Sequence, residues 1–496
     1  MTDTPVRTTD VASLVASLDG ARIFGALPTT TSGIAYDSRA VRSGTTFVAL
    51  RGEHVDGHRF LDEAIAAGAT IAIVDDAYAL AHPPDARIAV VAVPDTRRAL
   101  SRVAAAFYAY PTRSLSIAGV TGTNGKTTTT HLIAAICDAG GIATGRIGTL
   151  GAWFGGAMWS LDNTTPPALE LNRLLAEMRE RGARAVAMEV SSHALALERV
   201  RDVRFDIGVL TNVTRDHLDF HGTFEAYAAA KRSLFDRTRV AMFCADDALG
   251  AQWARELSSA GRNVVTFGLG VGAEVRAEGL ALHAHGSSFA VGGNRFSLGL
   301  PGRFNVANAL AALCVARAYG IEDAVSVKAL AAFERVPGRM EHFAGGGIDV
   351  LVDYAHTPDA LDVALRAARE TSSGSLSVVF GCGGDRDRGK RPQMGRIAHE
   401  LADRVYVTSD NPRREEPQAI VDEILAGMPA RADVRVDLDR RAAIRRAILE
   451  AAAGDVVIVA GKGHETYQIV GSTTSHFDDR DEVRAALAAR ESGQRA

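Results

Sequence analysis

The hydrophobic and polar positions of this chain alternate between short apolar runs and longer alanine-rich stretches. The apolar runs have the length of strands, and the stretches between them have the spacing of helices. Strands that alternate with helices indicate α/β units with largely parallel sheets. We predict a helix at Thr128–Cys137 and strands at Thr46–Leu50, Ala69–Val74, Ile88–Val93, Ser114–Ala118, Ala185–Glu189, Phe205–Thr211, Leu376–Phe380, Arg404–Ser409 and Asp455–Ala460.

Two proline-containing junctions divide the pattern into three blocks. The first block ends at Tyr110-Pro111-Thr112, and the second closes near Val336-Pro337-Gly338. A length of 496 residues agrees with this division, because one domain usually takes about 150 residues. We therefore predict domains at 1–112, 113–336 and 337–496.

Composition and charge narrow the class of protein. A net charge of −4 and a pI near 6.4 give no electrostatic footprint for nucleic acid or for an anionic membrane. The four cysteines form no CxxC pair, so we expect reduced, buried thiols rather than a zinc ribbon or a disulfide framework. Neither a signal peptide nor a membrane-spanning run is visible, which predicts a soluble cytoplasmic protein without membrane insertion.

Residues 119–128 read GVTGTNGKTT, between a predicted strand and a predicted helix. Glycines at such a place allow backbone N–H groups to point at phosphate oxygens, while a lysine reaches the β/γ-phosphates and a hydroxyl binds Mg²⁺. The usual pattern needs glycine at position 120, where this chain has Val120, so we interpret the segment as a tighter P-loop variant. The alternative is a glycine-rich turn without a ligand. The predicted ATP-binding residues here are Gly122, Thr123, Asn124, Gly125, Lys126, Thr127 and Thr128.

Two further segments offer metal ligands. Glu189 ends a predicted buried strand in the P-loop block and is suited to Mg²⁺, although an ordinary strand-end acid is the simpler interpretation. His217 and His221 are four residues apart, but Gly222 follows at once and no HExxH motif is present. A zinc pair is therefore disfavoured, and one of the two histidines at a second metal is the better hypothesis.

Lys231 has an unusual place in the pattern. It falls inside an apolar stripe at helical spacing that runs from Phe224 to Phe235. A lysine removed from water is more easily neutral, and a neutral amine captures CO₂ as a carbamate, which is an anionic oxygen ligand. The alternative is a lysine that extends to solvent from the edge of the helix.

Polar motifs also follow strands in the last two blocks. Asn305 and Asn308 open a predicted helix and are placed to face a nucleotide, and Arg339 and Asp353 lie at the junction with the last block. Asp410-Asn411-Pro412-Arg413 and Gly461-Lys462-Gly463-His464-Glu465 each follow a strand. At the carboxyl edge of a sheet, two such loops together indicate a substrate site rather than two plain turns.

The ordered set of motifs resembles the Mur ligase family over almost the whole chain. The resemblance implies an α/β protein of three domains: an N-terminal domain for a UDP-sugar substrate, a central P-loop domain for ATP and Mg²⁺, and a C-terminal Rossmann-like domain for an amino acid. The motifs that carry it are Tyr36–Arg39, Gly122–Thr128, Asn163–Pro166, Glu189–His193, Asn212–Gly222, Lys231, Gly302–Asn308, Pro337–Glu341, Asp353–Pro358, Gly383–Lys390, Asp410–Arg413 and Gly461–Glu465.

The activity implied by the resemblance is ATP-dependent amide formation in cytoplasmic peptidoglycan precursor synthesis. Such an enzyme would add meso-2,6-diaminopimelate to the D-Glu γ-carboxylate of UDP-N-acetylmuramoyl-L-Ala-D-Glu through an acyl phosphate, with release of ADP and phosphate. The choice between meso and LL isomers stays open at this point. The partners implied are these small molecules, with no nucleic acid, and the expected state is a monomer.

The resemblance also assigns residues. It places the UDP-substrate near Tyr36, Ser38, Glu53, His54 and Val55, the muramoyl-peptide at Thr164, Thr165, Ser191 and Arg199, and diaminopimelate at Arg386, Asp410, Asn411, Arg413, Gly461 and Glu465. Lys231 matches the carbamylated lysine of the family. The implied catalytic residues are Lys126, Glu189, His217 and Lys231, with one Mg²⁺ at Thr127 and Glu189 and another at His217 and Lys231. Leu197 departs from the family, which often has glutamine there, so we expect one polar substrate contact of the family to be missing or replaced.

Other functions share parts of this pattern. A folylpolyglutamate synthetase or a different Mur ligase would have the P-loop and the lysine, but Asp410-Asn411-Pro412-Arg413 argues against both. A P-loop switch or transport ATPase would need only a nucleotide for turnover. A binding protein that kept the fold without catalysis would have no need of four intact residues, which are Lys126, Glu189, His217 and Lys231.

Overall fold

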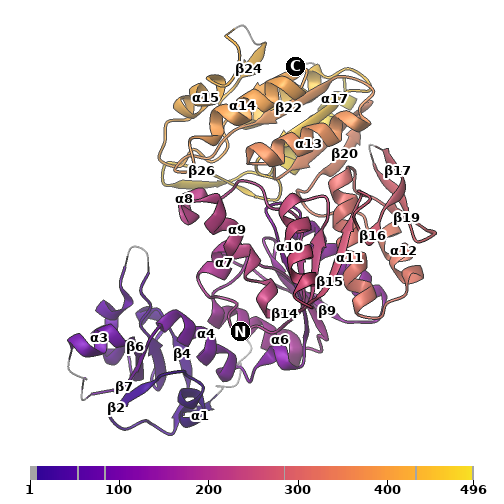
Figure 1. The fold of residues 1–496 in the computed structure, drawn as a ribbon. Coiled ribbons are helices and arrows are strands. Elements are labelled where there is room, and N and C mark those ends of the chain that lie inside the picture. The colour runs from indigo at the N-terminus through magenta and orange to yellow at the C-terminus, as the bar shows by residue number, and fades with distance from the viewer. Residues whose placement is uncertain are drawn as a thin grey trace. The chain divides into compact units, whose positions relative to one another are not determined.

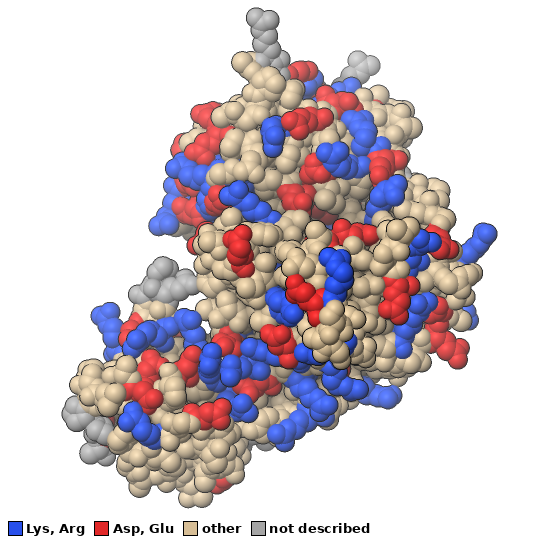
Figure 2. Space-filling view, viewed as in Figure 1, with Lys and Arg blue, Asp and Glu red and all other residues tan. Residues whose placement is uncertain are grey.

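The computed structural model describes residues 8–52, 55–82, 85, 87–283, 285–430 and 433–493 (Figure 1). By its internal contacts the chain divides into two compact units. The first unit consists of Met1–Thr121, Ile142–Gly208 and Ala229–Arg239, and the second of Gly122–Gly141, Val209–Ala228 and Val240–Ala496. Among the described helices, none has both the length and the hydropathy needed to cross a membrane. All four cysteines are buried free thiols, as predicted. Positive and negative side chains are interspersed over the face shown in Figure 2.

The first unit begins with a five-stranded sheet in the order β2-β7-β6-β5-β4, beside a short pair of strands, β1 (Thr9–Asp10) and β3 (Thr30–Thr31). Strands β4 (Gly33–Ala35), β5 (Thr45–Val48), β6 (Ala69–Asp75) and β7 (Ala89–Val93) are parallel, and β2 (Arg22–Phe24) is antiparallel to β7. Apolar clusters cover both faces, as parallel sheets require. The helices of this part are α1 (Val11–Ala16), α2 (Leu61–Ala66), α3 (Asp76–Ala81) and α4 (Thr96–Phe107).

A second set of strands in the first unit has the order β11-β10-β9-β12-β8. Strands β8 (Ser116–Thr121), β9 (Thr144–Gly148) and β12 (Ala185–Glu189) are parallel, and β10 (Gly151–Phe154) and β11 (Ala157–Trp159) extend them as an antiparallel meander. Helices α6 (Ala168–Glu180) and α7 (Ser192–Ala196) belong to this unit, while β13 (Phe205–Leu210) and α9 (Phe224–Arg232) each span the boundary with the second unit.

The strand before the P-loop runs later than predicted. We predicted Ser114–Ala118, whereas β8 is Ser116–Thr121 and includes Gly119. A Cβ at Gly119 would press on the ring of Phe205, so the glycine is a packing requirement of the strand rather than the start of the loop. The helix also begins earlier, because α5 is Lys126–Ala139 and its polar first turn hides the start of the apolar pattern.

The second unit starts with the loop Gly122–Gly125 and helix α5, which packs on α11 (Arg303–Ala318). It contains most of β14 (Thr238–Cys244), which begins in the first unit, and the strands β15 (Asn263–Gly268) and β16 (Val275–Arg276), all parallel. An antiparallel sheet of β17 (Glu278–His283), β18 (Gly286–Val291) and β19 (Asn294–Leu298) follows. Its other helices before residue 340 are α8 (Leu218–His221), α10 (Ala248–Ser259) and α12 (Asp323–Ala331).

The C-terminal part of the second unit is a six-stranded sheet in the order β20-β21-β25-β22-β23-β24. Strand β20 (Glu341–Gly345) is antiparallel to β21 (Ile348–Asp353), and β22 (Leu376–Phe380), β23 (Arg404–Val407), β24 (Val434–Val436) and β25 (Val456–Ala460) are parallel to it. One face packs on α13 (Pro358–Thr371), α14 (Lys390–Leu401) and α15 (Pro417–Leu425), and the other on α16 (Arg440–Glu450) and α17 (Asp479–Glu491). A hairpin of β26 (Tyr467–Val470) and β27 (Thr473–His476) follows β25.

The order of these strands brings the predicted polar loops to one edge. Strand β25 lies between β21 and β22, so the loops after these strands, and after the neighbouring β23, all leave from the carboxyl edge of the sheet. Ligands bind at this edge in open parallel sheets. The segments 354–357, 381–389, 408–416 and 461–466 therefore leave from one edge, as we predicted for the loops at 410–413 and 461–465.

Candidate functional site

The P-loop requires glycine at both ends. Gly122 and Gly125 have φ values of +147° and +87°, which disfavour any side chain. A Cβ at Gly122 would collide with the Thr211 hydroxyl, and one at Gly125 with the side-chain amide of Asn308. The chain therefore curls tightly before α5, as a phosphate-binding loop must.

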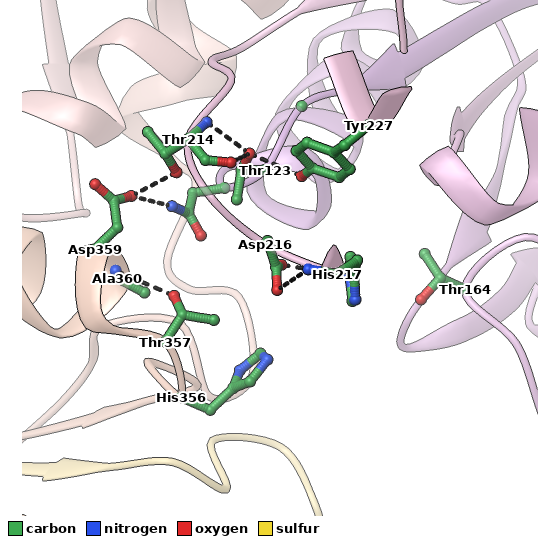
Figure 3. A network of polar contacts seen from close by, with 12 residues as sticks. Thr123, Thr164, Thr214, Asp216, His217, Tyr227, His356, Thr357, Asp359 and Ala360 are labelled. Carbon is green, nitrogen blue, oxygen red and sulfur yellow. Dashed lines mark hydrogen bonds and ion pairs between the residues drawn. The ribbon is translucent and has the colours of Figure 1, made fainter. Parts of the chain in front are cut away.

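The loop is held from one side by the segment that follows β13. Asn212 accepts hydrogen bonds from the backbone N–H groups of Thr123 and Asn124, each at 2.9 Å. The hydroxyl of Thr123 accepts a hydrogen bond from the N–H of Thr214 at 2.9 Å and lies 2.9 Å from the hydroxyl of Tyr227 (Figure 3). Burial raises the pKa of Tyr227, so this phenol stays protonated and fixes the loop as a neutral partner.

Lys126 folds back over the loop. Its Nζ donates hydrogen bonds to the carbonyl oxygens of Gly122 at 2.9 Å and of Thr123 at 2.7 Å. These carbonyls hold the ammonium at the mouth of the loop, beside the N-terminus of α5. A cation next to a helix N-terminus is the arrangement that binds nucleotide phosphates.

Asn305 and Asn308 are buried beneath the same helix start. Asn308 Oδ1 accepts a hydrogen bond from Thr129 at 3.2 Å, and its Nδ2 donates to Asn305 Oδ1 at 3.2 Å. Asn305 in turn donates to the carbonyl of Pro301 at 2.8 Å. These contacts give the pair a role in positioning α5, and contact between Asn305 and a nucleotide stays a prediction.

Asp359, at the start of α13, connects the C-terminal sheet to the P-loop. Its Oδ2 accepts a hydrogen bond from Asn124 Nδ2 at 2.8 Å and another from the Thr214 hydroxyl at 2.9 Å (Figure 3). Burial raises the pKa of Asp359. Thr357 caps the helix by accepting a hydrogen bond from the N–H of Ala360, which places the carboxylate in the first turn.

Arg339 makes a second connection to the P-loop. Its Nη2 donates to the Thr127 hydroxyl at 3.4 Å, and its guanidinium lies over the ring of Tyr354, 4.4 Å from the centroid. The carboxylate of Asp353 accepts a hydrogen bond from the N–H of Met340 at 2.7 Å, and burial raises its pKa. The predicted residues Arg339 and Asp353 thus lie together at the start of the C-terminal part.

Asp216 is a charged residue of the same region that the sequence analysis did not select. Its Oδ2 lies 3.3 Å from Nε2 of His217, whose φ of 51° is left-handed. Burial pushes the pKa of Asp216 upward, but the nearby His217 and His356 bring it below its usual value, so the carboxylate stays charged. Burial and the neighbouring Lys390 lower the pKa of His356.

Four predicted residues of the first unit form one network around Glu189. The buried carboxylate accepts hydrogen bonds from the N–H and the hydroxyl of Thr149, at 2.9 and 3.1 Å. Thr149 lies 3.1 Å from the hydroxyl of Thr164. The hydroxyl of Thr165 donates to the Glu189 carbonyl at 2.8 Å and accepts from the N–H of Ser191 at 3.0 Å.

Arg199 extends this network toward the N-terminal sheet. Its Nη1 donates to the carbonyl of Thr165 at 2.9 Å, and burial lowers its pKa. Burial raises the pKa of Tyr36, which lies near enough to Arg199 for the charge to act on it. Ser38 donates to a carboxylate oxygen of Glu63 at 3.1 Å. Val55 is exposed, and Glu53 and His54 lie outside the described residues.

Lys231 is buried near the end of α9. Its exposure is 2%, and its neighbours Tyr227, Leu234 and Phe235 are fully buried. This burial does not fit a lysine that extends to solvent from a helix edge. The amine is therefore shielded from water, as the carbamate hypothesis requires.

The loops at the carboxyl edge of the C-terminal sheet are organised by a lysine. Lys462, fully buried, donates to Asn411 Oδ1 at 2.9 Å and to the Tyr467 carbonyl at 2.8 Å, and it lies 3.2 Å from a carboxylate oxygen of Asp410. Asn411 Nδ2 donates to Glu465 at 2.9 Å, and burial raises the pKa of Glu465. Three predicted residues thus surround one cation.

Arg413 is held by the hairpin β26–β27. Its N–H donates to the Ile469 carbonyl at 3.1 Å, its carbonyl accepts from the N–H of Gly471 at 2.7 Å, and its φ is 51°. Its Nη1 donates to the carbonyl of Gly384 at 2.8 Å. The guanidinium therefore has a fixed direction at the sheet edge. Arg386 is exposed on the adjoining loop, and Gly461, with a φ of +118°, packs against Asp410.

Three family models match this chain: the Mur ligase family catalytic domain over residues 30–108, the Mur ligase middle domain over 120–316 and the Mur ligase glutamate ligase domain over 338–463. The chain is 47% identical to the UDP-N-acetylmuramoyl-L-alanyl-D-glutamate–2,6-diaminopimelate ligase of Gloeobacter violaceus, over 93% of this chain and 94% of that protein. The ligase of the same name from Thermosynechococcus vestitus is 48% identical over 90% and 91%. This chain belongs to the Mur ligase family.

A solved structure agrees with this assignment. The structure of a UDP-N-acetylmuramoyl-L-alanyl-D-glutamate–2,6-diaminopimelate ligase has a TM-score of 0.67 and 34% identity to this chain, over 93% of this chain and 96% of the other. The predicted three-domain Mur ligase architecture is thereby confirmed. As a Mur ligase, the chain is an ATP-dependent ligase that forms amide bonds.

Several polar residues of this Mur ligase were not selected from the sequence. Asp359, Asp216, Tyr227 and Lys462 act on segments far away along the chain, so spacing alone gave no sign of their partners. Lys462 carried one usable signal, because it stands between two glycines directly after a predicted buried strand. A lysine at that place is suited to neutralise carboxylates at the sheet edge.

An ion pair supports the loop 408–416 at the carboxyl edge of the C-terminal sheet. The fully buried Arg391 donates to both carboxylate oxygens of Glu415 at 2.9 Å, and these hydrogen bonds lower the pKa of Glu415 from its ordinary value of 4.5 to about 2. Glu415 also accepts a hydrogen bond from the N–H of Asp385. Because the pKa is depressed in the folded state, the stabilisation is present above about pH 4.5 and is lost as the pH falls toward 2.

We expect Glu415→Gln to destabilise the second unit at neutral pH by about 1–3 kcal/mol, because the buried guanidinium of Arg391 then keeps only one of its two carboxylate partners, Glu423. The difference from wild type should narrow as the pH falls from about 4.5 toward 2, because the carboxylate of the unfolded wild-type chain is protonated over this range before that of the folded protein. Urea unfolding at several pH values measures this difference in the free energy of unfolding. Glu416→Gln, at the exposed next position, is the control; equal shifts in both variants would contradict the assignment.

Proposed function

We propose that this Mur ligase adds meso-2,6-diaminopimelate to the D-Glu γ-carboxylate of UDP-N-acetylmuramoyl-L-Ala-D-Glu, with conversion of ATP to ADP and phosphate. The proposal rests on hydrogen bonds that join the P-loop to residues beside the carboxyl edge of the C-terminal sheet. Asp359 accepts one from Asn124, and Arg339 donates one to Thr127. A ligase needs this link, because the carboxylate activated at the nucleotide must meet an amine. Relatives of this name at 47–48% identity support the substrates.

The chemistry follows from the weakness of a carboxylate as an acylating agent. Its oxygen attacks the γ-phosphate of ATP in line, and Lys126 at the loop mouth spreads the charge of the phosphoryl group in transfer. The product is an acyl phosphate. The amine of diaminopimelate attacks its carbonyl carbon, phosphate leaves the tetrahedral intermediate, and an amide forms. The P-loop residues 122–128 thus hold the phosphates, and we expect Asn305 and Asp353 nearer the nucleoside.

Three of the four proposed Mg²⁺ ligands offer oxygen, which Mg²⁺ prefers, and the fourth offers an imidazole nitrogen. Glu189 offers a buried carboxylate in the first unit, and Thr127 and His217 offer a hydroxyl and an imidazole in the second. We propose each as a ligand, together with Lys231 after its neutral amine has added CO₂ and released a proton. Mg²⁺ at these ligands would neutralise charge on the phosphates and on the substrate carboxylate.

The remaining assignments are proposals of the same kind. We propose Tyr36, Ser38 and Val55, with Glu53 and His54, for the UDP-substrate, and Thr164, Thr165, Ser191 and Arg199 for the muramoyl-peptide. Arg386, Asp410, Asn411, Arg413, Gly461 and Glu465 would hold diaminopimelate. We also propose a cytoplasmic monomer that acts in peptidoglycan precursor synthesis, with domains at 1–112, 113–336 and 337–496.

Phosphate release tests the whole reaction. ATP should be converted to ADP and phosphate at an appreciable rate only when both the UDP-muramoyl dipeptide and diaminopimelate are present, because the acyl phosphate forms on one substrate and is consumed by the other. Lys126→Ala is the inactive control. Equal turnover with ATP alone would contradict the proposed reaction and indicate an ATPase that needs no other substrate. Turnover with a folate and glutamate would favour a folylpolyglutamate synthetase.

A further inference from the structure

A cluster of metal-binding side chains lies away from the nucleotide and substrate loops of the second unit. His285, His342 and Asp349 each present one ligand atom, and these atoms lie within 4.8 Å of one another. The rings of the two histidines have centroids 4.5 Å apart at an interplanar angle of 62°, and His342 Nε2 lies 2.7 Å from an Asp349 carboxylate oxygen. None of the three belongs to the motifs assigned above.

The register of the C-terminal sheet explains why His342 and Asp349 lie close together. Strand β20 pairs with β21 so that Ala344 stands opposite Asp349, and His342 lies two residues from Ala344 on the same face. His342 and Asp349 are therefore diagonal neighbours across the two strands. Phe343 and Val350 point to the other face, into the apolar cluster under α16 and α17. The pair is thus fixed in place by the packing of its own strands.

His285 comes from a different sheet. It lies in the turn between β17 and β18, within the region matched by the middle-domain model, whereas β20 and β21 lie in the region of the glutamate ligase domain. Strand β17 also contacts α13, which covers the face of His342 and Asp349. Two imidazoles that face each other repel when both are protonated, but both can donate a lone pair to one cation.

We propose that His285, His342 and Asp349 form a binding site for a zinc-type divalent cation that ties the β17–β18 hairpin to the C-terminal sheet. Two imidazoles and a carboxylate are ligands that zinc binds readily, while Mg²⁺ prefers oxygen donors. Zinc holds such ligands at about 2.0–2.2 Å, which puts them about 3.3 Å apart. The exposed His285 closes the remaining distance by rotation of its side chain, and water completes the coordination.

Zinc titration of the metal-stripped full chain tests the site, in excess Mg²⁺ so that oxygen-rich sites are occupied. His285→Gln, His342→Gln and Asp349→Asn each remove one ligand and keep a polar side chain of similar size. His283→Gln is the matched control, since His283 is an exposed histidine on the same hairpin outside the cluster. Calorimetry should show one tight zinc equivalent in wild type and in the control, weakened at least about 100-fold in the three variants.

Two further measurements address geometry and the link between the sheets. Co²⁺ bound in place of zinc should give visible absorption bands of a low-symmetry nitrogen and oxygen site in wild type, and these bands should be lost in the three variants. Zinc should also slow amide hydrogen exchange at the β17–β18 turn and along β20 together. Unchanged affinity in His285→Gln or His342→Gln, or an equal loss in His283→Gln, would overturn the proposal. Neither readout uses ligase activity, so this result is independent of the proposed reaction.

Discussion

Lys231→Ala is expected to reduce the rate of ligation by about 10²–10³-fold at saturating ATP, the usual cost of removing one group that stabilises transition-state charge. Lys231 is 2% exposed, and its neighbours in the apolar stripe are buried. A carbamate forms when a neutral amine adds CO₂ and gives up a proton, which turns the side chain into an anion. Loss of this anion removes a proposed ligand of Mg²⁺ but leaves the P-loop intact.

Three measurements separate this role from a structural one. Lys231→Met keeps the length and the apolar stem, so it should fold as wild type and yet stay inactive. A short carboxylate such as formate should partly restore the alanine variant, because it fits the space of the lost group. With ¹³C-labelled CO₂, wild type should show a carbamate resonance that Lys231→Met lacks. Lys328→Ala, at an exposed position of α12, is the control.

Near wild-type activity of Lys231→Met would contradict the assignment, as would the absence of the carbamate resonance in active wild-type protein. A variant that unfolds is recognised by thermal melting, and the resonance of the wild-type protein then still decides the question. The prediction is thus tested without reliance on a single substitution.

The sequence was most informative where local pattern and packing agree. Strands Ala185–Glu189 and Leu376–Phe380 are buried on both faces, so their apolar runs have the bounds of the strands themselves. The strand before the P-loop was placed too early because Gly119 reads as a loop residue. In the fold, Gly119 is a strand residue beneath the ring of Phe205, and nothing in its local sequence shows that ring.

Contacts between distant segments could not be predicted in this way. Asp359 lies 235 positions from its partner Asn124, and local spacing carries no information about such a pair. Its position in the first turn of a capped helix indicated only a favourable interaction with the helix dipole. Residues proposed to bind a ligand were easier to select than those that position them, because ligand-binding motifs use several residues of restricted type in one short segment.

The second large effect is expected at Arg413, in the proposed binding site for the amino acid that accepts the acyl group. Diaminopimelate and lysine differ at the far end of the side chain, where diaminopimelate has a carboxylate in addition to the ammonium. A guanidinium matches that carboxylate with two parallel hydrogen bonds. Arg413 has its backbone held on both sides by the β26–β27 hairpin, and its Nη1 bonded to Gly384, so the direction of the fork is set before the substrate arrives. Glu465, held by Asn411, would take the ammonium.

We therefore expect wild-type protein to use lysine about 10⁴-fold less efficiently than diaminopimelate, because lysine leaves the arginine without its anion. Arg413→Ala should lose most of its kcat/KM for diaminopimelate and most of this preference, while its KM for ATP stays near the wild-type value. Arg413→Lys keeps the positive charge but lacks the planar guanidinium. Its kcat/KM for diaminopimelate should therefore lie between the values of wild type and of Arg413→Ala. Arg414→Ala, at the exposed neighbouring residue, should behave as wild type. Efficient use of lysine by wild type, or an unchanged preference in Arg413→Ala, would show that another group selects the acceptor.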